Sequence, residues 1–331
     1  MISSFQKFVR FALVTLAVLA FCTACSALPS LESSPWVPVA LETDATIQDL
    51  SFIDHNHGWL VGNHSTLMET QDGGQTWSLR TLETDGPEYR FNAISFSGNE
   101  GWAVGEPSIL LHTEDGGQNW NRISLSSRLP GNPVKVVAVG PQSAEMVTDV
   151  GAIYSTQDAG QNWTALVKEA FGVTRNVNRS VDGQYVAVSS RGSFYSIWRP
   201  GQDSWEPHNR NSSKRVQNMG FAPDGKMWML NRGGLIQFLD NSTSDDWSNP
   251  ENPAPASGIG LLDIGYRTPN ELWVSGGSGR LLCSKDGGES WSVDPSVENV
   301  PSNLYRVLFF DQDLGFITGQ DGTLLRYVEQ A

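Results

Sequence analysis

Short apolar stretches alternate with turn-forming residues along almost the whole chain. In the first full unit, apolar runs at Ile47–Phe52, Gly58–Gly62 and Thr66–Thr70 are followed by a turn and then by Trp77. Runs of this length, bounded by Gly, Asn and Asp, are typical of β-strands rather than helices. Similar groups of four runs recur about every 43 residues, so the pattern predicts a repeated, four-stranded antiparallel sheet.

A turn motif marks the end of several of these units. It reads [Ser/Thr]-x-Asp-[Gly/Ala]-Gly-x-x-Trp and occurs at Thr70–Trp77, Thr113–Trp120, Thr156–Trp163 and Ser284–Trp291. The Asp carboxylate can accept backbone N–H groups while Gly supplies a positive φ, which together close a tight turn. The Trp then starts the returning strand and buries its ring. We therefore expect hairpin tips with structural roles for Asp72, Asp115, Asp158 and Asp286.

The tryptophans give the number of units, which is seven. They are Trp36, Trp77, Trp120, Trp163, Trp205, Trp247 and Trp291, although the turn motif is reduced in the fourth and fifth units. The last unit ends one strand short at Thr323–Tyr327, while Ser34–Val39 resembles a closing strand that has no hairpin before it. We predict an all-β fold, a seven-bladed β-propeller over residues 35–331 with four antiparallel strands per blade. The N-terminal strand would close the last blade and hide its edge.

The N-terminus has the features of an export signal. Residues 1–24 place two basic residues ahead of an uncharged apolar run, Phe11–Phe21, which is too short to span a bilayer. The segment Cys22–Cys25 (Cys-Thr-Ala-Cys) resembles a bacterial lipobox, although Leu is usual where Cys22 stands. We expect a lipoprotein signal peptide over residues 1–24, lipidation of Cys25 and a tether over residues 25–34. Cleavage after Ala27 without a lipid is the alternative.

Basic residues are predicted to gather on one face of this ring. Because the strands alternate in direction, the connections between blades and the loops joining second to third strands open on the same face. That face is expected to be basic, whereas the face with the Asp turns is expected to be acidic. Arg outnumbers Lys there, and guanidinium suits carboxylate and phosphate partners. The candidate partner-binding residues are Arg90, Arg175, Arg191, Arg215, Arg232, Arg280 and Arg306.

The net charge of the whole chain is −14, which argues against nucleic acid as a partner. A basic face on such an acidic protein favours an acidic or carboxylate-bearing partner. Ordinary solvated loop charge is the alternative interpretation of the same arginines.

Other chemistries have weaker support in the sequence. The Asp turn is frequent in sialidases and other glycosidases, which need two carboxylates at a defined separation, and the loop-face candidates are Glu106, Asp149 and Asp321. His55 and His57 fall on the acidic face and His64 on the basic face, so we do not expect them to share a metal. Neither a P-loop nor a dinucleotide fingerprint occurs, and we expect no cofactor. An exported, sialidase-like glycosidase and a generic protein-binding propeller of the cell envelope stay open as alternatives.

Together these features resemble the photosystem II stability and assembly factors of cyanobacteria and chloroplasts. The similarity covers the lipobox at Cys25, the Trp36 strand, the seven Trp-marked units and the Asp-Gly-Gly-x-x-Trp turns. Membership would imply a non-enzymatic protein, lipid-anchored on the lumenal side of the thylakoid membrane. It would also imply that an arginine patch binds newly made D1 precursor, with other early photosystem II assembly components as partners. The resemblance assigns this patch to Arg175, Arg191, Arg215, Arg232 and Arg280.

Overall fold

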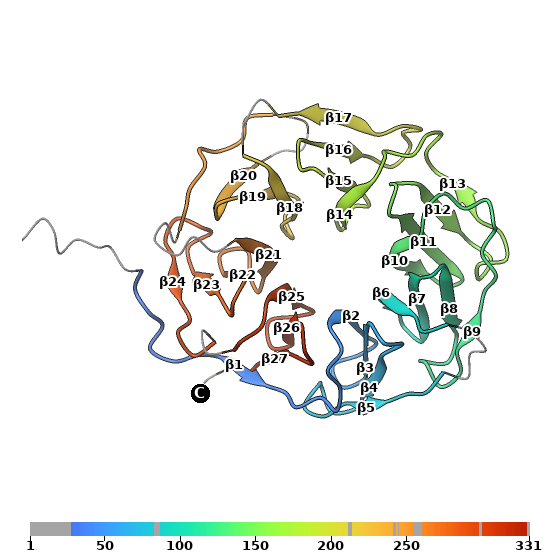
Figure 1. The fold of residues 1–331 in the computed structure, drawn as a ribbon, viewed down its shortest axis with the longest axis horizontal. Helices are drawn as coiled ribbons and strands as arrows, with labels where there is room; N and C mark the ends of the chain where they lie inside the picture. Colours follow the sequence, from blue (N-terminus) through green and yellow to red (C-terminus); the bar gives the residue numbers. More distant parts are fainter. Residues whose placement is uncertain are drawn as a thin grey trace, which may run out of the picture.

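The structure is a ring of β-sheets around a central channel (Figure 1). It is a computed structural model that describes residues 28–82, 87–210, 214–240, 243, 245–253, 260–297 and 300–329. Every regular element within these ranges is a β-strand, and the strands form seven antiparallel sheets. The all-β, seven-bladed architecture expected from the tryptophan spacing is therefore confirmed.

Each blade is a set of strands that runs from the channel to the rim. Blade 1 holds β2 (Ile47–Phe52), β3 (Gly58–Gly62), β4 (Leu67–Thr70) and β5 (Ser78–Leu79). Blade 2 holds β6 (Arg90–Ser97), β7 (Glu100–Glu106), β8 (Ile109–Thr113) and β9 (Asn121–Arg122). Blade 3 holds β10 (Pro133–Gly140), β11 (Ser143–Thr148), β12 (Ile153–Thr156) and β13 (Thr164–Ala165).

The second half of the ring follows the same plan. Blade 4 holds β14 (Thr174–Arg179), β15 (Tyr185–Ser189), β16 (Phe194–Trp198) and β17 (Glu206–Asn209). Blade 5 holds β18 (Val216–Phe221), β19 (Met227–Asn231) and β20 (Leu235–Leu239). Blade 6 holds β21 (Leu261–Tyr266), β22 (Leu272–Gly276), β23 (Leu281–Ser284) and β24 (Ser292–Val293). Blade 7 holds β25 (Leu304–Phe309), β26 (Gly315–Gly319), β27 (Leu324–Tyr327) and β1 (Trp36–Pro38).

The ring closes where the N-terminal strand joins the last blade. Strand β1 pairs antiparallel with β27, and Val37 lies opposite Arg326. The Trp36 ring is buried and packs edge-on against Trp273 of blade 6 and Tyr327 of blade 7, with ring centroids 5.4 Å apart in both pairs. The predicted closure is confirmed, and Trp36 of the closing strand also packs between blades 6 and 7.

Blade 5 departs from the four-stranded prediction within the described residues. Its sheet has three strands. The segment after it bonds to β20 without forming a regular strand, through an isolated bridge between Ile236 and Glu251 and through the Ser248 N–H, which donates to the Phe238 carbonyl at 2.9 Å. Trp247 still packs against the core shared by blades 4 and 5, and its Nε1 donates a hydrogen bond to Tyr195 Oη at 3.1 Å. Trp247 therefore packs as the tryptophans of the other blades do, although blade 5 has no regular fourth strand within the described residues.

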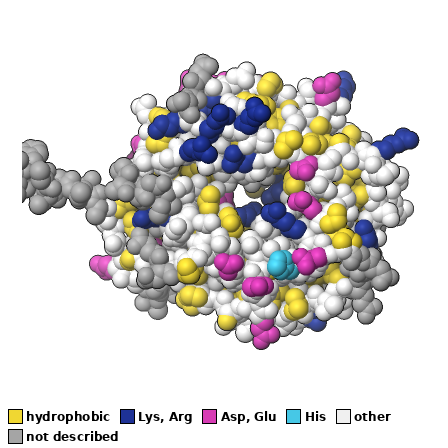
Figure 2. Space-filling view, viewed as in Figure 1, with side chains coloured by type: hydrophobic (Ala, Val, Ile, Leu, Met, Phe, Trp, Pro, Cys, Tyr) yellow, Lys and Arg dark blue, Asp and Glu magenta, His cyan; other side chains and the backbone are white. Residues whose placement is uncertain are grey.

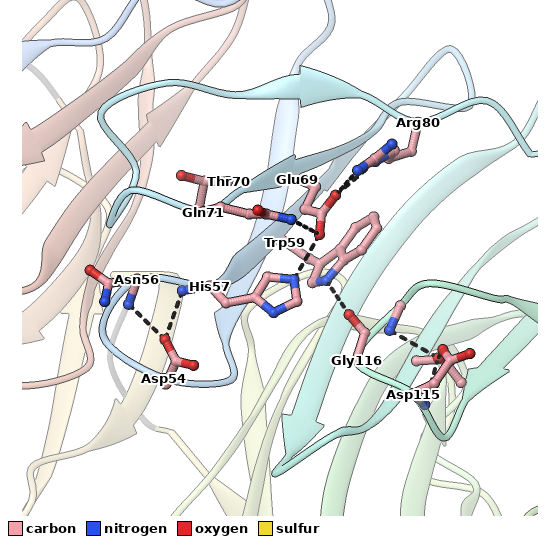
Figure 3. Close-up of polar contacts among 12 residues, drawn as sticks. Asp54, Asn56, His57, Trp59, Glu69, Thr70, Gln71, Arg80, Asp115 and Gly116 are labelled. Carbon is pink, nitrogen blue, oxygen red and sulfur yellow. Dashed lines mark hydrogen bonds and ion pairs between the residues drawn. The ribbon is translucent and has the colours of Figure 1, made fainter.

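The Asp turns connect neighbouring blades as well as closing their own hairpins. In blade 2, Thr113 Oγ1 donates to Asp115 Oδ1 at 2.8 Å and accepts the Gly117 N–H at 3.0 Å. Trp59 of blade 1 donates its Nε1–H to the Gly116 carbonyl at 3.0 Å (Figure 3). The structural role predicted for these turns is supported by this geometry, which recurs with hydroxyl–carboxylate distances of 2.8–2.9 Å at Asp72, Asp158 and Asp286.

The second glycine of the motif is needed for this contact between blades. Gly117 has φ +90°, and a Cβ there would lie 2.3 Å from Cζ2 of Trp59. The equivalent Gly74 and Gly288 meet Phe316 and Phe238, each a ring from the preceding blade, at 2.4 Å and 2.9 Å. No side chain fits at such distances, so the Gly lets the preceding blade's aromatic ring pack directly on the turn.

A buried carboxylate lies beside the blade 1 turn. Glu69 accepts hydrogen bonds from His57 Nε2 at 2.8 Å, Gln71 Nε2 at 3.2 Å and Arg80 Nε at 2.7 Å (Figure 3). Burial alone would raise the pKa of Glu69, but the hydrogen bonds from Arg80 and Gln71 outweigh it and lower that pKa. His57 is thus part of a structural ion-pair cluster on this side of the ring.

Replacing Gly117 with Ala is expected to lower the free energy of unfolding by roughly 2–5 kcal/mol. About 1–2 kcal/mol comes from the left-handed backbone and the rest from the clash with Trp59. Gly225→Ala is the matched control, because Gly225 has φ +86° and nothing lies within 4 Å of the point that a Cβ would occupy there. Chemical denaturation of both variants separates the two contributions, and equal losses would contradict the clash.

Removing the Trp36 side chain is expected to open the ring's closing joint. Trp36→Ala should lower the free energy of unfolding by about 3–5 kcal/mol, as for other buried aromatic truncations. Val37→Ala is the neighbouring control, because Val37 is 48% exposed and should change stability by less than about 0.5 kcal/mol. Thermal and denaturant unfolding measure both, and a Trp36 effect as small as that of Val37 would argue against this closure.

Candidate partner-binding face

Two sets of loops lie on opposite faces of the ring. The turns between first and second strands bond to the Asp turns on their own face, as in Gly73 N to Asn56 O at 2.9 Å and Gly116 N to Asn99 O at 2.8 Å. On the other face, loops from different blades meet at the mouth of the channel, which is lined by Asn63, Arg90, Glu106, Asp149 and Arg175, among others. This arrangement agrees with the faces deduced from strand parity.

Four of the predicted arginines come together on blades 4 and 5. Arg175 is the second residue of β14, and Arg215 directly precedes β18. Arg191 lies in the β15–β16 loop and Arg232 in the β19–β20 loop. All four side chains are exposed. We call this set the blade 4–5 arginine cluster. Figure 2 shows Lys and Arg side chains gathered over these strands, beside the opening of the channel.

Hydrogen bonds to backbone carbonyls hold the cluster's loops against one another. Arg215 Nη1 donates to the Arg191 carbonyl at 3.0 Å, and the Arg232 N–H donates to the Arg215 carbonyl at 2.7 Å. Arg175 donates to the Ser190 carbonyl at 2.8 Å. A Cβ at Gly192 would lie 2.3 Å from the Val216 carbonyl oxygen, so a Gly is needed where the two loops touch. The guanidinium groups are thereby presented from a packed loop pair.

The other three predicted arginines lie apart from this cluster. Arg280 is half-buried in the β22–β23 loop of blade 6, where its carbonyl accepts the Gly276 N–H at 2.9 Å. Arg90 is exposed at the start of β6 and lines a pocket of about 450 Å³ that also contains His64, Glu88 and Glu106. The placement of His64 here, far from His57 and Glu69, agrees with the predicted separation of the histidines.

Arg306 lies inside the channel rather than on a connecting loop. It belongs to β25, the inner strand of blade 7, and forms an ion pair with the buried carboxylate of Asp49 in blade 1. The expectation that Arg306 belongs to a loop between blades was wrong, because the inner strand already begins at Leu304. Its predicted contact with a partner remains a prediction.

Seven equivalent positions form a ring around the channel, which has a volume of about 810 Å³. Every inner strand has a register shift near its start, and the residue directly after that shift faces the same layer of the channel. The seven residues, from blade 1 to blade 7, are Asp49, Ala93, Lys135, Asn176, Asn218, Asp263 and Arg306.

Polar contacts run along most of this ring. Asn176 Nδ2 donates to Asn218 Oδ1 at 2.6 Å, Asn218 Nδ2 donates to Asp263 Oδ1 at 3.0 Å, and Asp263 Oδ2 accepts the Val307 N–H at 3.0 Å. The polar side chains therefore tie blades 4 to 7 together through the channel wall. Short sequence motifs do not reveal this ring, although aligning the seven inner strands shows a polar residue there in all blades but the second.

Burial shifts two titratable groups of the ring in opposite senses. Burial raises the pKa of Asp263 to about 6, against the lowering effects of Arg306 and the Val307 N–H. Burial and the nearby Arg306 charge lower the pKa of Lys135 to about 8, against the raising effect of Asp49. Both shifts follow from removing a charge from bulk water.

The carboxylates weighed for a glycosidase have other contacts. Glu106 and Asp149 both line the channel, so the loop face is not poor in carboxylates. Asp149 Oδ1 accepts the Asn132 N–H at 3.0 Å, and Glu106 Oε1 accepts from Asn92 at 3.3 Å. Asp321 has φ +54° and occupies the turn before β27. These are the positions of turn-forming and wall-forming residues.

The predicted membrane anchor lies outside the described residues. Cys25 and the signal segment 1–24 belong to the part of the chain for which no structure is described. Among the described residues, none forms a helix long and apolar enough to cross a bilayer.

Comparison with known proteins identifies the family. The model of a family described as "Photosynthesis system II assembly factor YCF48" matches residues 28–328. The chain belongs to this family. A Synechocystis protein named "Photosystem II assembly lipoprotein Ycf48" is 62% identical over 301 residues, covering 91% of this chain and 88% of the relative. The Arabidopsis thaliana "Photosystem II stability/assembly factor HCF136, chloroplastic" is 46% identical, covering 89% of this chain and 79% of the relative.

Solved structures of the Ycf48 family share the architecture. One titled "YCF48 bound to D1 peptide" is 58% identical with a TM-score of 0.89, covering 92% of this chain and 100% of its own. Another, "YCF48 from Cyanidioschyzon merolae", is 40% identical with a TM-score of 0.84, covering 89% and 99%. A virginiamycin B lyase from Staphylococcus aureus has a TM-score of 0.71 at 10% identity, which reflects the propeller fold alone.

Asp263 should make stability depend on pH in a defined window. Its folded pKa of about 6 exceeds the ordinary value of 3.8, so the folded state binds more protons between these pH values. The free energy of unfolding should therefore fall by up to about 3 kcal/mol from this group as pH rises from about 4 to 6. Denaturation of the native chain and of Asp263→Asn across that range measures the difference between them. A difference that stays constant with pH would contradict the shift.

Proposed function

We propose that this protein is a non-enzymatic assembly and repair factor of photosystem II that binds newly made D1 precursor through the blade 4–5 arginine cluster. The observation that carries the proposal is four exposed arginines on two adjacent blades of a chain with net charge −14. A relative 58% identical to this chain was solved with a D1 peptide, which supports the same partner here. Other early assembly components of photosystem II are further partners in this proposal.

The cluster suits an acidic segment of the partner. Guanidinium groups form paired, charge-assisted hydrogen bonds to carboxylates. Hydrogen bonds to backbone carbonyls hold the cluster loops in place, which limits the entropy lost on binding. The arginines are exposed, so salt should screen the interaction and weaken binding. Arg280 and Arg90 on the same face, and Arg306 inside the channel, are further candidate contacts.

We place the protein on the lumenal side of the thylakoid membrane, held there by a lipid on Cys25. The sequence before Cys25 resembles a lipobox, and the Synechocystis relative is named a lipoprotein, which supports a lipid anchor here. Mass spectrometry of the mature N-terminus tests the modification.

Replacing Arg191, Arg215 and Arg232 together with Ser should weaken binding of a D1 precursor peptide. We expect a loss of roughly 10- to 100-fold, which corresponds to exposed charged hydrogen bonds of about 0.5–1 kcal/mol each. Calorimetry or fluorescence anisotropy at low and high salt measures the affinity, and the native chain should lose more affinity on salt addition than the variant.

The matched control removes three positive charges elsewhere. Arg122, Lys168 and Lys226 are exposed and lie outside the cluster, so changing all three to Ser gives the same net charge. Binding that falls equally in both triple variants would indicate a general charge effect. Unchanged binding in the cluster variant would end the proposal for these residues while leaving the fold intact.

A further inference from the structure

The segment before β1 is bound to blade 6 as an extra edge strand. The Leu31 N–H donates to the Val293 carbonyl and the Val293 N–H donates to the Pro29 carbonyl, both at 2.9 Å. Ser30 and Val293 form a parallel bridge. The chain therefore runs along β24, the outermost strand of blade 6, before it crosses to blade 7.

Side chains fasten the same segment to the rim. Leu28 packs on the blade 5–6 core that contains Trp291, and Leu31 packs on the core that contains Trp36. Ser34 Oγ donates to Oδ2 of the fully buried Asp294 at 2.5 Å. The described part of the expected tether is thus attached at both ends and in the middle.

This attachment shortens the distance that a lipid on Cys25 could reach. Only Ser26 and Ala27 lie between Cys25 and Leu28, so three Cα–Cα steps limit the span to about 10 Å for a fully extended chain. If the segment were free up to Trp36, the eleven Cα–Cα steps from Cys25 would allow about 40 Å. A bilayer holding the lipid must therefore lie beside the blade 6 rim.

We propose that the outer edge of blade 6 faces the lipid bilayer and that the docked segment at residues 28–34 fixes this orientation. This inference rests on one part of the proposed function, the lipid on Cys25. Blades 2 and 3 then point away from the membrane, on the far side of the ring (Figure 1). Blade 5 adjoins blade 6 and blade 4 follows it around the ring (Figure 1), so the blade 4–5 arginine cluster begins one blade away from the membrane-facing edge, within reach of the soluble segment of a membrane-bound partner.

The repeated Asp turn provides equivalent labelling positions on different blades, so their distances from the membrane can be compared. The second position of the motif is exposed in four blades, at Gln71 (blade 1), Glu114 (blade 2), Gln157 (blade 3) and Lys285 (blade 6). A single Cys at each position can carry a fluorophore in the same local geometry. Cys283 is buried, and burial raises the pKa of its thiol to about 12, so it should not compete for the label.

The lipidated chain is bound to phosphatidylcholine–phosphatidylglycerol vesicles that carry a head-group energy acceptor. Energy transfer should be strongest from Lys285→Cys, weaker from Gln71→Cys, and weakest and similar from Glu114→Cys and Gln157→Cys. Equal transfer from all four positions would overturn the orientation. A chain that fails to float with the vesicles would overturn it as well, and peptide binding in solution would report on the proposed function independently.

A longer tether gives the matched control for the mechanism. About twelve Gly and Ser residues inserted between Ala27 and Leu28 add a flexible reach of about 20 Å without touching the docked segment. The differences in energy transfer among the four labelled positions should then become smaller, while the chain still floats with the vesicles. An unchanged order would show that another surface of the propeller sets the orientation, which contradicts a role for the short span.

Discussion

Pairing of β1 with β27 is the constraint on which the rest of the molecule depends. No covalent bond joins β1 to β27 across the closing seam. Without β1, the outer edge of the last blade would be unpaired and would expose backbone donors and acceptors. The closing strand comes from the N-terminal part of the chain, so it meets the C-terminal segment at one seam, where the Val328 N–H donates to the Pro35 carbonyl at 2.8 Å. Closure therefore also determines where the segment toward the expected lipid leaves the body.

The repeated scaffold supports an asymmetric surface. All seven inner strands share the same register shift, yet the residue after it varies from Asp49 and Asp263 to Lys135 and Arg306. The backbone repeats because each blade packs on the next in the same way. Side chains facing the channel or solvent have no such requirement, which leaves them free to differ. The arginine cluster on two of the seven blades is a second case of the same separation between scaffold and surface.

Much of this architecture could be predicted because its signals are local and periodic. Turn residues fix hairpins, tryptophans mark outer strands, and strand parity assigns loops to faces. Three features depend on contacts between distant residues and could not be predicted. Blade 5 has three strands among the described residues, Arg306 lies in the channel and pairs with Asp49, and residues 29–31 bond to β24. The resemblance assigned Arg280 to the same patch as Arg191, but only the folded loops show which arginines are neighbours.

In the proposed function, location at the membrane would compensate for the weakness of each surface contact. An exposed ion pair contributes only about 0.2–1 kcal/mol, so four arginines alone give modest affinity for a soluble acidic segment. A lipid-anchored chain and a membrane-bound partner share one surface, which raises their effective concentration without any new contact. This gain requires that the cluster can reach the partner while the anchor stays in the bilayer. Docking of residues 28–34 on blade 6, which adjoins blade 5 of the cluster, would meet that requirement through the same seam that closes the ring.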